Sequence, residues 1–171
     1  NGVKNINQNL AVGSCRLSIF DISENGRMPM SDVTGNFTIV YNGEIYNFPE
    51  LKKEFKIQTR TGTDTEVIVE LYKKYGSACL KLFNGIFSFI IHDKKKNTLF
   101  CARDRLGVKP FYYYWKDNKF IACSEIKGIN EIIPKYINYD KIYSYIKTSF
   151  YDFGVDTFYK SVFELEPSTY L

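Results

Sequence analysis

The chain has 171 residues, of which 44% are hydrophobic and 17% aromatic, and its formal net charge is +4. This length and composition suit one domain with a sizeable core, and so mild a charge does not favour a nucleic-acid partner. No apolar run reaches the length that crosses a membrane and no signal peptide is visible, so we expect no membrane partner. Reduced thiols in a cytoplasmic protein are the simplest account of the scattered cysteines.

The cysteines and the single histidine restrict the chemistry. Cys15, Cys79, Cys101 and Cys123 form no C-x-x-C pair, which argues against a zinc ribbon or a disulfide framework. His92 follows an apolar run, and we expect it near solvent at the end of a strand. A lone histidine offers no Ser-His-Asp or Cys-His arrangement, so acyl transfer would need another base. A free N-terminal amine is one candidate.

The N-terminal third predicts a loop, a strand and a connector. Polar residues 1–9 predict a loop or frayed end, and an apolar run from Leu10 leads into an alternating strand over residues 16–20. Arg16 is a candidate for binding a carboxylate, because its planar guanidinium donates two parallel hydrogen bonds. A surface ion pair is the alternative. Residues 21–36 are rich in Gly, Pro, Ser and Asp and predict a connector.

Residues 37–50 bring together the groups most suited to chemistry. β-Branched and aromatic residues over 37–41 predict a buried strand, and Asn42-Gly43 predicts a tight turn. Asn42 offers side-chain N–H donors, Gly43 an unobstructed backbone N–H, and Glu44 a carboxylate for an ammonium group. Two donors aimed at one point suit a developing oxyanion. An ordinary hairpin turn with a solvated Glu44 is the alternative at this stage.

Capping signals predict the next helices. Asn47 is expected to cap a short helix over 49–55. Residues 63–66, Thr-Asp-Thr-Glu, form a capping-box pattern before a helix that ends at Gly76. On local grounds Asp64 complements the helix dipole at this start.

The remaining chain changes to the period of strands. Hairpin-linked strands, followed by separate helices, predict an α+β fold with antiparallel sheets. The charges of residues 103–110 are expected to pair with one another at a turn. The elements predicted after Gly76 are a short helix over 78–83, strands over 86–91, 98–102, 111–115 and 120–123, helices over 124–133 and 140–147, and an extended tail from Val162.

Five segments, taken together, resemble the glutamine amidotransferase domain of asparagine synthetase. They occur in the family's order and cover nearly all of the chain, and the Asn-Gly-Glu-Ile-Tyr-Asn form separates this family from other N-terminal-nucleophile amidotransferases. The segments are Arg-Leu-Ser-Ile-Phe-Asp at 16–21, Tyr-Asn-Gly-Glu-Ile-Tyr-Asn at 41–47, Thr-Asp-Thr-Glu at 63–66, residues 102–112 and Ser-Glu-Ile-Lys at 124–127.

The resemblance implies a four-layer αββα sandwich of two antiparallel sheets that hydrolyses glutamine to glutamate and ammonia. In such domains an N-terminal cysteine attacks the amide and its own α-amine is the base. By the same resemblance, Asn42 and the Gly43 N–H form the oxyanion hole, Arg16 binds the glutamine α-carboxylate, Glu44 and Asp64 hold its α-ammonium group, and the backbone of Leu17 and Ile19 lines the pocket. Asp64 is then a ligand as well as a helix-start residue.

The sequence departs from the family at two points. None of its four cysteines is first in the chain, and the family's His-Arg-Gly-Pro-Asp segment is absent. Met28 stands where the family usually has Gln. We therefore expect residues 1–171 to be one amidotransferase domain that lacks its N-terminal nucleophile and stops before a C-terminal synthetase domain. The fragment itself is expected to be inactive, and the parent protein active.

The expected cofactors and partners follow from the resemblance. No metal or cofactor is expected in this domain, whereas ATP and Mg²⁺ would act in the missing synthetase domain, which would amidate aspartate. The expected partners are glutamine and that synthetase domain, with a homodimer left open. Two alternatives are an enzyme with another carboxylate acceptor and a non-catalytic scaffold that has lost its nucleophile.

Overall fold

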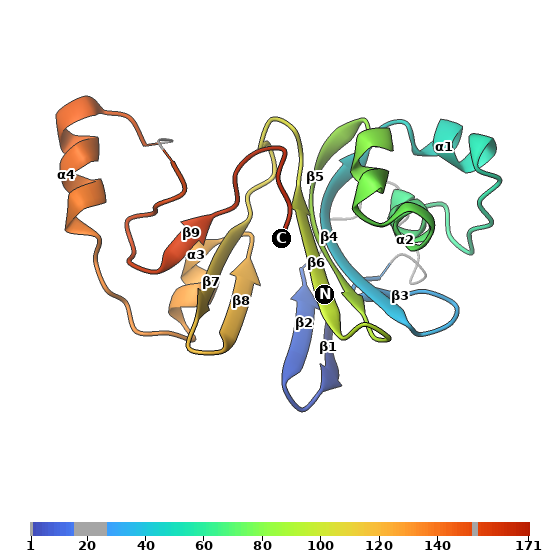
Figure 1. Cartoon of the computed structure of the whole chain (residues 1–171), viewed down its shortest axis with the longest axis horizontal. Coiled ribbons are helices and arrows are strands. Elements are labelled where there is room, and N and C mark those ends of the chain that lie inside the picture. The colour runs from blue at the N-terminus through green and yellow to red at the C-terminus, as the bar shows by residue number, and fades with distance from the viewer. Residues whose placement is uncertain (1, 16–26, 152–153) are drawn as a thin grey trace. The chain divides into compact units, whose positions relative to one another are not determined.

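A computed structural model describes residues 2–15, 27–151 and 154–171 and divides the chain into two compact units. The first unit contains the residues up to Ala102 together with Leu171, and the second unit runs from Arg103 to Tyr170 (Figure 1). Each unit has its own antiparallel strand pairs and its own helices.

The first unit is built on a four-stranded sheet in the order β3-β4-β5-β6, in which β4 pairs antiparallel with both β3 and β5. A separate antiparallel hairpin is formed by β1 and β2. The elements are β1 Gly2–Asn7, β2 Leu10–Ser14, β3 Met30–Ser31, β4 Phe37–Ile45, α1 Phe48–Glu54, α2 Asp64–Tyr75, the 3₁₀ helix η2 Gly76–Leu82, β5 Gly85–Asp93 and β6 Thr98–Arg103.

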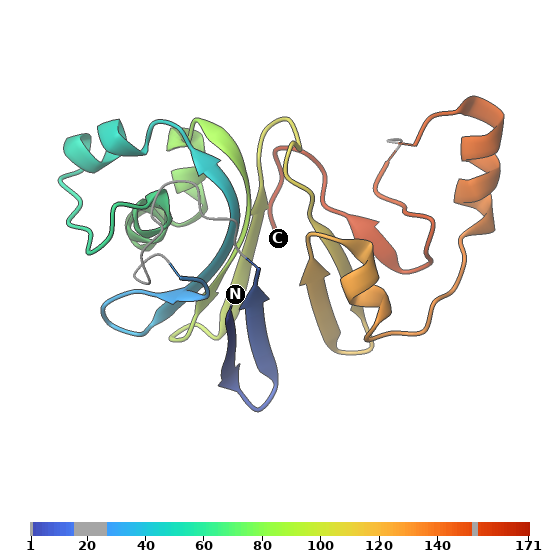
Figure 2. The same ribbon diagram turned by 180° about the vertical axis from the view of Figure 1, so that it is seen from behind.

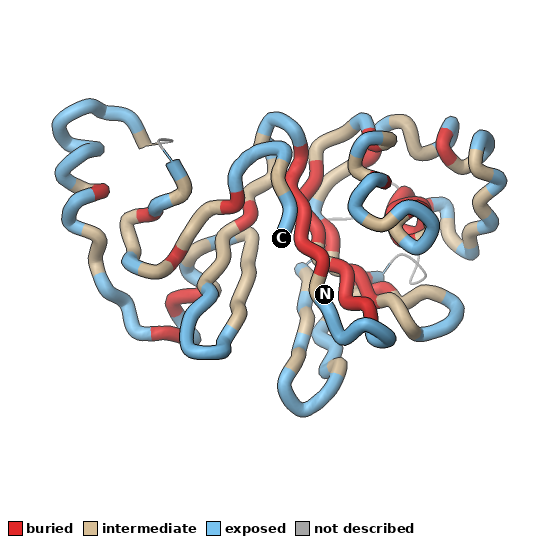
Figure 3. The backbone as a smooth tube through the Cα atoms, viewed as in Figure 1, coloured by how far each residue is buried: buried red, intermediate tan, exposed pale blue. Residues whose placement is uncertain are grey.

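The helices of the first unit cover one face of this sheet, as Figures 1 and 2 show from opposite sides. Ile39, Tyr41 and Ile45 of β4 lie in one buried cluster with Val67 and Leu71 of α2. Figure 3 shows the buried stretches concentrated along the central strands and α2. Because successive side chains of a strand point to opposite faces, the even-numbered residues of β4 point away from the helices.

The structure contradicts the tight turn predicted at Asn42-Gly43. Strand β4 continues through both residues, with Asn42 opposite Ser88 and Gly43 opposite Phe87 on β5. Gly43 has a φ of 152°, and a Cβ there would overlap the carbonyl oxygen of Ile86. Pairing along nine residues outweighs the local turn tendency, and glycine permits the close approach of the two backbones.

The loop predicted over residues 1–9 is also wrong, because β1 pairs with β2 in spite of its polar side chains. Backbone hydrogen bonds between two strands can form a hairpin that has no apolar face. The hydrophobic pattern of the sequence therefore gave no sign of this hairpin. The expected strand at Leu10 is confirmed as β2. The strand predicted over 16–20 lies outside the described residues.

Helices α1 and α2 are confirmed, but their predicted side-chain caps are not. Asn47 directs its side chain to the Leu82 carbonyl and the Asn84 N–H, each at 2.9 Å, and so joins the start of α1 to the segment before β5. Thr63 makes no side-chain cap to α2. The α2 helix ends at Gly76, as predicted.

The second unit contains a three-stranded sheet in the order β8-β7-β9. Its helix α3 is shorter than the predicted helix over 124–133 and begins after Glu125 rather than after Ser124. The elements are β7 Tyr112–Lys116, β8 Lys119–Cys123, α3 Ile126–Asn130, α4 Tyr139–Thr148 and β9 Val162–Glu164. The α+β class with antiparallel strands is thus confirmed, and helices packed on sheets are consistent with a sandwich.

Two charges of the 103–110 link are used to shape its backbone. The carboxylate of Asp104 accepts backbone N–H bonds from Leu106, Val108 and Lys109, each at 3.0 Å. Arg103 donates to the Lys109 carbonyl and pairs with Glu164 at 2.7 Å. The charges of Arg103 and Asp104 thus bind backbone groups of the link and β9, while the pairing of the link's charges with one another stays a prediction.

Within the described part of the chain, no helix is long and apolar enough to cross a membrane, and no cluster of His, Cys, Asp or Glu is arranged to hold a metal ion.

We expect Gly85→Ala to lower the free energy of unfolding by about 1–3 kcal/mol. A Cβ at Gly85 would overlap the Glu44 carbonyl oxygen and lie 2.8 Å from the Ile45 Cα, so the two strands would have to separate. Gly62→Ala is the matched control, because a Cβ there meets no atom within 4 Å. Urea unfolding of both variants measures the difference; equal stability would contradict the close strand approach.

Candidate active site at the end of strand β4

Three of the predicted site residues, Asn42, Gly43 and Glu44, follow one another near the end of β4. Asn42 is exposed, and Gly43 and Glu44 are half-buried. The alternation of the strand places Asn42 and Glu44 on the face opposite to the helices, while Tyr41 and Ile45 belong to the helix-covered core. An amide donor and a carboxylate therefore share one face of the sheet.

The fourth residue, Asp64, reaches the same strand from the first position of α2. Its Oδ2 atom accepts a hydrogen bond from the Tyr41 hydroxyl at 2.6 Å and another from the Ile45 N–H at 2.8 Å. The residue is 6% exposed. Residues that are about twenty positions apart in the sequence are thereby fixed together, and Asp64 lies beside the end of β4, as the proposed site requires.

The Ile45 hydrogen bond also indicates where the Gly43 N–H points. In an antiparallel pair, N–H groups two residues apart lie on the same edge of the strand. Ile45 donates to Asp64 rather than to β5, so the Gly43 N–H points to the edge away from β5. On that edge the described part of β3 pairs with β4 only at Thr38 and Ile39. The Gly43 N–H is thus not part of the backbone pairing that β4 makes with β5 or with the described residues of β3. It lies about 7 Å along the strand from the Ile45 N–H.

The protonation of Asp64 is set by opposing effects. Burial raises the pKa of its carboxyl above the usual value, while hydrogen bonds from Tyr41 and Ile45 partly lower that pKa. The net direction is upward, so Asp64 is more easily protonated than an exposed aspartate. A carboxylate of this kind binds a cation only while it is ionised, which makes the site sensitive to mild acid.

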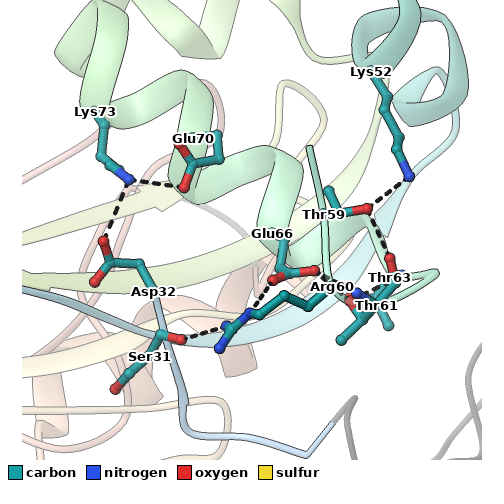
Figure 4. Close-up of polar contacts among 10 residues, drawn as sticks. All are labelled: Ser31, Asp32, Lys52, Thr59, Arg60, Thr61, Thr63, Glu66, Glu70 and Lys73. Carbon is teal, nitrogen blue, oxygen red and sulfur yellow. Dashed lines mark hydrogen bonds and ion pairs between the residues drawn. The ribbon is translucent and has the colours of Figure 1, made fainter. Parts of the chain in front are cut away.

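The loop that leads into Asp64 is held by Glu66, as Figure 4 shows. Glu66 accepts from the Thr61 N–H at 2.7 Å, from the Thr61 hydroxyl at 2.8 Å and from Arg60 Nε at 3.0 Å. Arg60 in turn donates to the Ser31 carbonyl at 2.8 Å. Burial alone would raise the pKa of Glu66, but these bonds hold it below the usual value, so the carboxylate stays charged. The capping-box pattern therefore orders the preceding loop rather than the helix start.

A cavity of about 580 Å³ lies near this network, between β3, the α1–α2 loop and α2. Several of its charged groups are paired with one another: Lys73 contacts Glu70 at 2.8 Å and Asp32 at 3.3 Å (Figure 4). The cavity is not lined by the candidate residues on β4 or by Asp64. We therefore do not assign glutamine to this cavity.

The described structure places four of the predicted site residues near one another in the fold, with Asn42 and Glu44 on the face opposite to the helices and Asp64 bonded to Tyr41 and Ile45 of the helix-covered side. Asn42, Gly43, Glu44 and Asp64 lie around one strand end, whereas Arg16, Leu17 and Ile19 are outside the described residues. Sequence reasoning missed Tyr41 as a partner of Asp64. The signal available was a tyrosine on the buried face of a strand, since a buried hydroxyl needs a hydrogen-bond partner.

His92, Cys79 and Cys101 are unsuited to form a nucleophile–base pair. His92 is 4% exposed rather than near solvent, because β5 continues to Asp93 and His92 lies opposite Thr38. Burial lowers the pKa of His92. Burial raises the pKa of Cys79 and of Cys101 to about 12, so both thiols stay protonated.

The raised pKa of Asp64 predicts a pH-dependent effect of Asp64→Asn on stability. A group whose pKa is higher in the folded state than in the unfolded state stabilises most below its unfolded pKa, and this contribution is lost as the pH rises through the folded pKa. The asparagine oxygen can still accept from Tyr41 and Ile45. The unfolding free energy of Asp64→Asn relative to the original chain should therefore increase from pH 4 to pH 7. Urea unfolding across this range measures it, and a difference that falls with pH would contradict the burial effect.

Comparison with known proteins places the chain in a family. The family model described as the glutamine amidotransferase domain matches residues 3–171. A protein of Methanocaldococcus jannaschii, provisionally named asparagine synthetase 2 (glutamine-hydrolyzing), is 47% identical over 94% of this chain and 34% of its own length. Asparagine synthetase 3 (glutamine-hydrolyzing) of Bacillus subtilis is 45% identical over 68% of this chain and 20% of its own length. The chain thus spans about a third or less of these curated relatives.

Among solved structures, glutamine phosphoribosylpyrophosphate amidotransferase of B. subtilis matches with a TM-score of 0.55 and 21% identity, over 66% of this chain and 27% of that one. At this identity the likeness concerns the fold alone, and it agrees with the α+β class with antiparallel sheets. The sequence match extends over nearly every residue, including those around the end of β4. The chain therefore belongs to the glutamine amidotransferase domain family.

Proposed function

We propose that this chain is the glutamine-hydrolysing domain of a larger amidotransferase and that the end of β4 binds the glutamine substrate. The observation that carries the proposal is the attachment of Asp64 to the Ile45 N–H, two residues beyond Gly43. A carboxylate for an ammonium group and a backbone donor for an oxyanion are thereby fixed at neighbouring points of one strand. Glutamine carries its ammonium group at one end and its carboxamide at the other, so the carboxylate could bind the first and the backbone donor the second.

In the proposed reaction, a cysteine thiolate from outside this chain attacks the carboxamide carbon. The negative charge that develops on the amide oxygen is stabilised by the Asn42 side-chain N–H and the Gly43 backbone N–H. The α-amine of that cysteine, which takes up the thiol proton, returns it to the amide nitrogen. The carbon–nitrogen bond then breaks, ammonia leaves, and water hydrolyses the resulting thioester to glutamate and the free thiol. Neither donor has to be charged, and Gly43 has no side chain to block the substrate.

The amino-acid end of glutamine is held by the remaining residues of the proposal. Glu44 and Asp64 supply negative charge for the α-ammonium group. Arg16 is assigned to the α-carboxylate, since a guanidinium and a carboxylate form paired hydrogen bonds. The backbone of Leu17 and Ile19 is assigned to the pocket wall. The roles of these last three residues rest on the resemblance of their segment to the family.

We further propose that the parent protein is a glutamine-hydrolysing asparagine synthetase. The names and identities of the two curated relatives support this assignment over another carboxylate acceptor. ATP and Mg²⁺ would act in the part of those relatives that this chain does not span, where aspartate would accept the ammonia. The cytoplasmic location and the homodimer stay predictions.

We expect Asn42→Ala in the full-length protein to lower kcat for glutamine hydrolysis about a hundredfold or more, with little change in KM. An oxyanion donor acts mainly in the transition state, so its loss affects turnover more than substrate binding. Steady-state release of glutamate measures both constants. Asn9→Ala, an exposed asparagine in the β1–β2 hairpin, is the control. A KM that rises in proportion to the loss of kcat would instead assign Asn42 to ground-state binding.

A thiol-reactive glutamine analogue should inactivate the full-length protein by labelling an N-terminal cysteine rather than a cysteine of this chain. Cys79 and Cys101 are buried and protonated, and Cys15 is exposed but is not at a chain start. Mass spectrometry of the labelled peptides identifies the site. Cys15→Ser is expected to be inactivated at the original rate, and protection of this variant would disprove the assignment.

A further inference from the structure

The hydroxyl group of Tyr41 has no part in the proposed reaction, yet it forms a close contact with one of its residues. Tyr41 is 7% exposed and donates to Asp64 Oδ2 at 2.6 Å. We propose that Tyr41 is a positioning residue that keeps Asp64 ionised and oriented for the α-ammonium group of glutamine. This inference rests on the proposed function, because it assigns a supporting group to the same site.

The Tyr41 hydroxyl is a hydrogen-bond donor throughout the pH range in which the enzyme works. Burial raises the pKa of the Tyr41 hydroxyl, and the negative charge of Asp64 raises it further. The hydroxyl therefore does not lose its proton near neutrality. A buried O–H of this kind is directed to the acceptor available to it, and here that acceptor is Oδ2 of Asp64.

Asp64 depends on this donor. Burial disfavours the carboxylate form, and the hydrogen bond from Tyr41 is the largest effect in the opposite direction. The other short contact, from the Ile45 N–H, belongs to the backbone and is the same for nearly any residue at that position. Tyr41 is therefore the side chain that most strongly lowers the pKa of Asp64 and so favours its charged form.

The carboxylate of Asp64 is carried by α2, whereas both donors to its Oδ2 belong to β4, which also carries Asn42 and Gly43. The two hydrogen bonds thus fix the ammonium-binding group relative to the strand that carries the oxyanion donors. Loss of the Tyr41 bond would leave backbone N–H groups alone, those of Ile45 and of the helix start at Asp64 and Thr65, to set the orientation of the carboxylate.

Other titratable groups on the packed elements are engaged elsewhere or act on Tyr41 itself. Glu44 on β4 raises the pKa of Tyr41 by its charge. Glu66 of α2 is directed to Thr61 and Arg60, and Lys52 of α1 donates to Thr59 at 2.6 Å. Among the described residues, Tyr41 is the titratable side chain with a recorded hydrogen bond to Asp64.

The test is the pH profile of kcat/KM for glutamine hydrolysis by the full-length protein, since this ratio reports ionisations of the free enzyme. In Tyr41→Phe the acid limb should move to higher pH by about half a unit to one unit, because the carboxylate has lost a donor. On the plateau, KM should rise about three- to tenfold and kcat should change less than about threefold.

Two controls separate positioning from a general structural effect. Tyr72→Phe removes a hydroxyl from the same unit, where the Tyr72 ring stacks on Phe100, and it should leave the acid limb unchanged. Replacement of Tyr41 by 3-fluorotyrosine keeps the volume and makes the hydroxyl a stronger donor, so the limb should move to lower pH. This replacement also decides the question if Tyr41→Phe fails to fold. An acid limb at the original pH in the folded Tyr41 variants would overturn the proposal.

Asp64→Asn separates this inference from the proposed function. The variant should bind glutamine more weakly at every pH and lose the acid limb that Asp64 contributes. If its KM equals that of the original protein, the ammonium-binding role of Asp64 in the proposed function is wrong. If its KM rises but the Tyr41 substitutions leave the acid limb unmoved, the proposed function stands and the positioning role of Tyr41 is rejected.

Discussion

The candidate site depends on one buried interaction, the carboxylate of Asp64 held between the Tyr41 hydroxyl and the Ile45 N–H. A buried charge is costly unless donors compensate for it. Here the donors come from a strand and the acceptor from a helix, so satisfying the charge also joins β4 to the start of α2. The hydrogen bonds that compensate the charge of Asp64 thus hold the start of α2 beside β4, the strand that carries the proposed oxyanion donors.

The site also depends on how closely β4 and β5 approach. Gly43 and Gly85 lie on opposite strands, and a Cβ at either position would overlap a carbonyl oxygen of the other strand. These two glycines let the backbones come together where β4 ends. Gly43 has no side chain that could cover its own N–H, which points to the edge away from β5.

The sequence could predict the elements better than their connections. The β-branched and aromatic residues of 37–41, the apolar run over 86–91 and the capping-box pattern before residue 67 indicated elements that the structure confirms. The Asn42-Gly43 turn was wrong because its fate depends on pairing with a strand more than forty residues away. Asn47 does not cap α1 for a similar reason, because its side chain binds Leu82 and Asn84, more than thirty residues away. Glu66 instead binds Thr61 in the preceding loop, a local alternative to the capping box.

A comparison of two buried aspartates explains why Asp64, rather than the charged link, suits ligand binding. Asp104 is 1% exposed and accepts hydrogen bonds from backbone N–H groups of its own loop, so its carboxylate stabilises the conformation of that loop. Asp64 also accepts backbone N–H bonds at its own helix start, but two of its donors, Tyr41 and Ile45, belong to a distant strand, and burial still keeps its pKa raised. A carboxylate that its surroundings compensate only in part gains more from an incoming cation than one that its own loop already satisfies. The same residue type therefore serves structure in one unit and, we propose, substrate binding in the other.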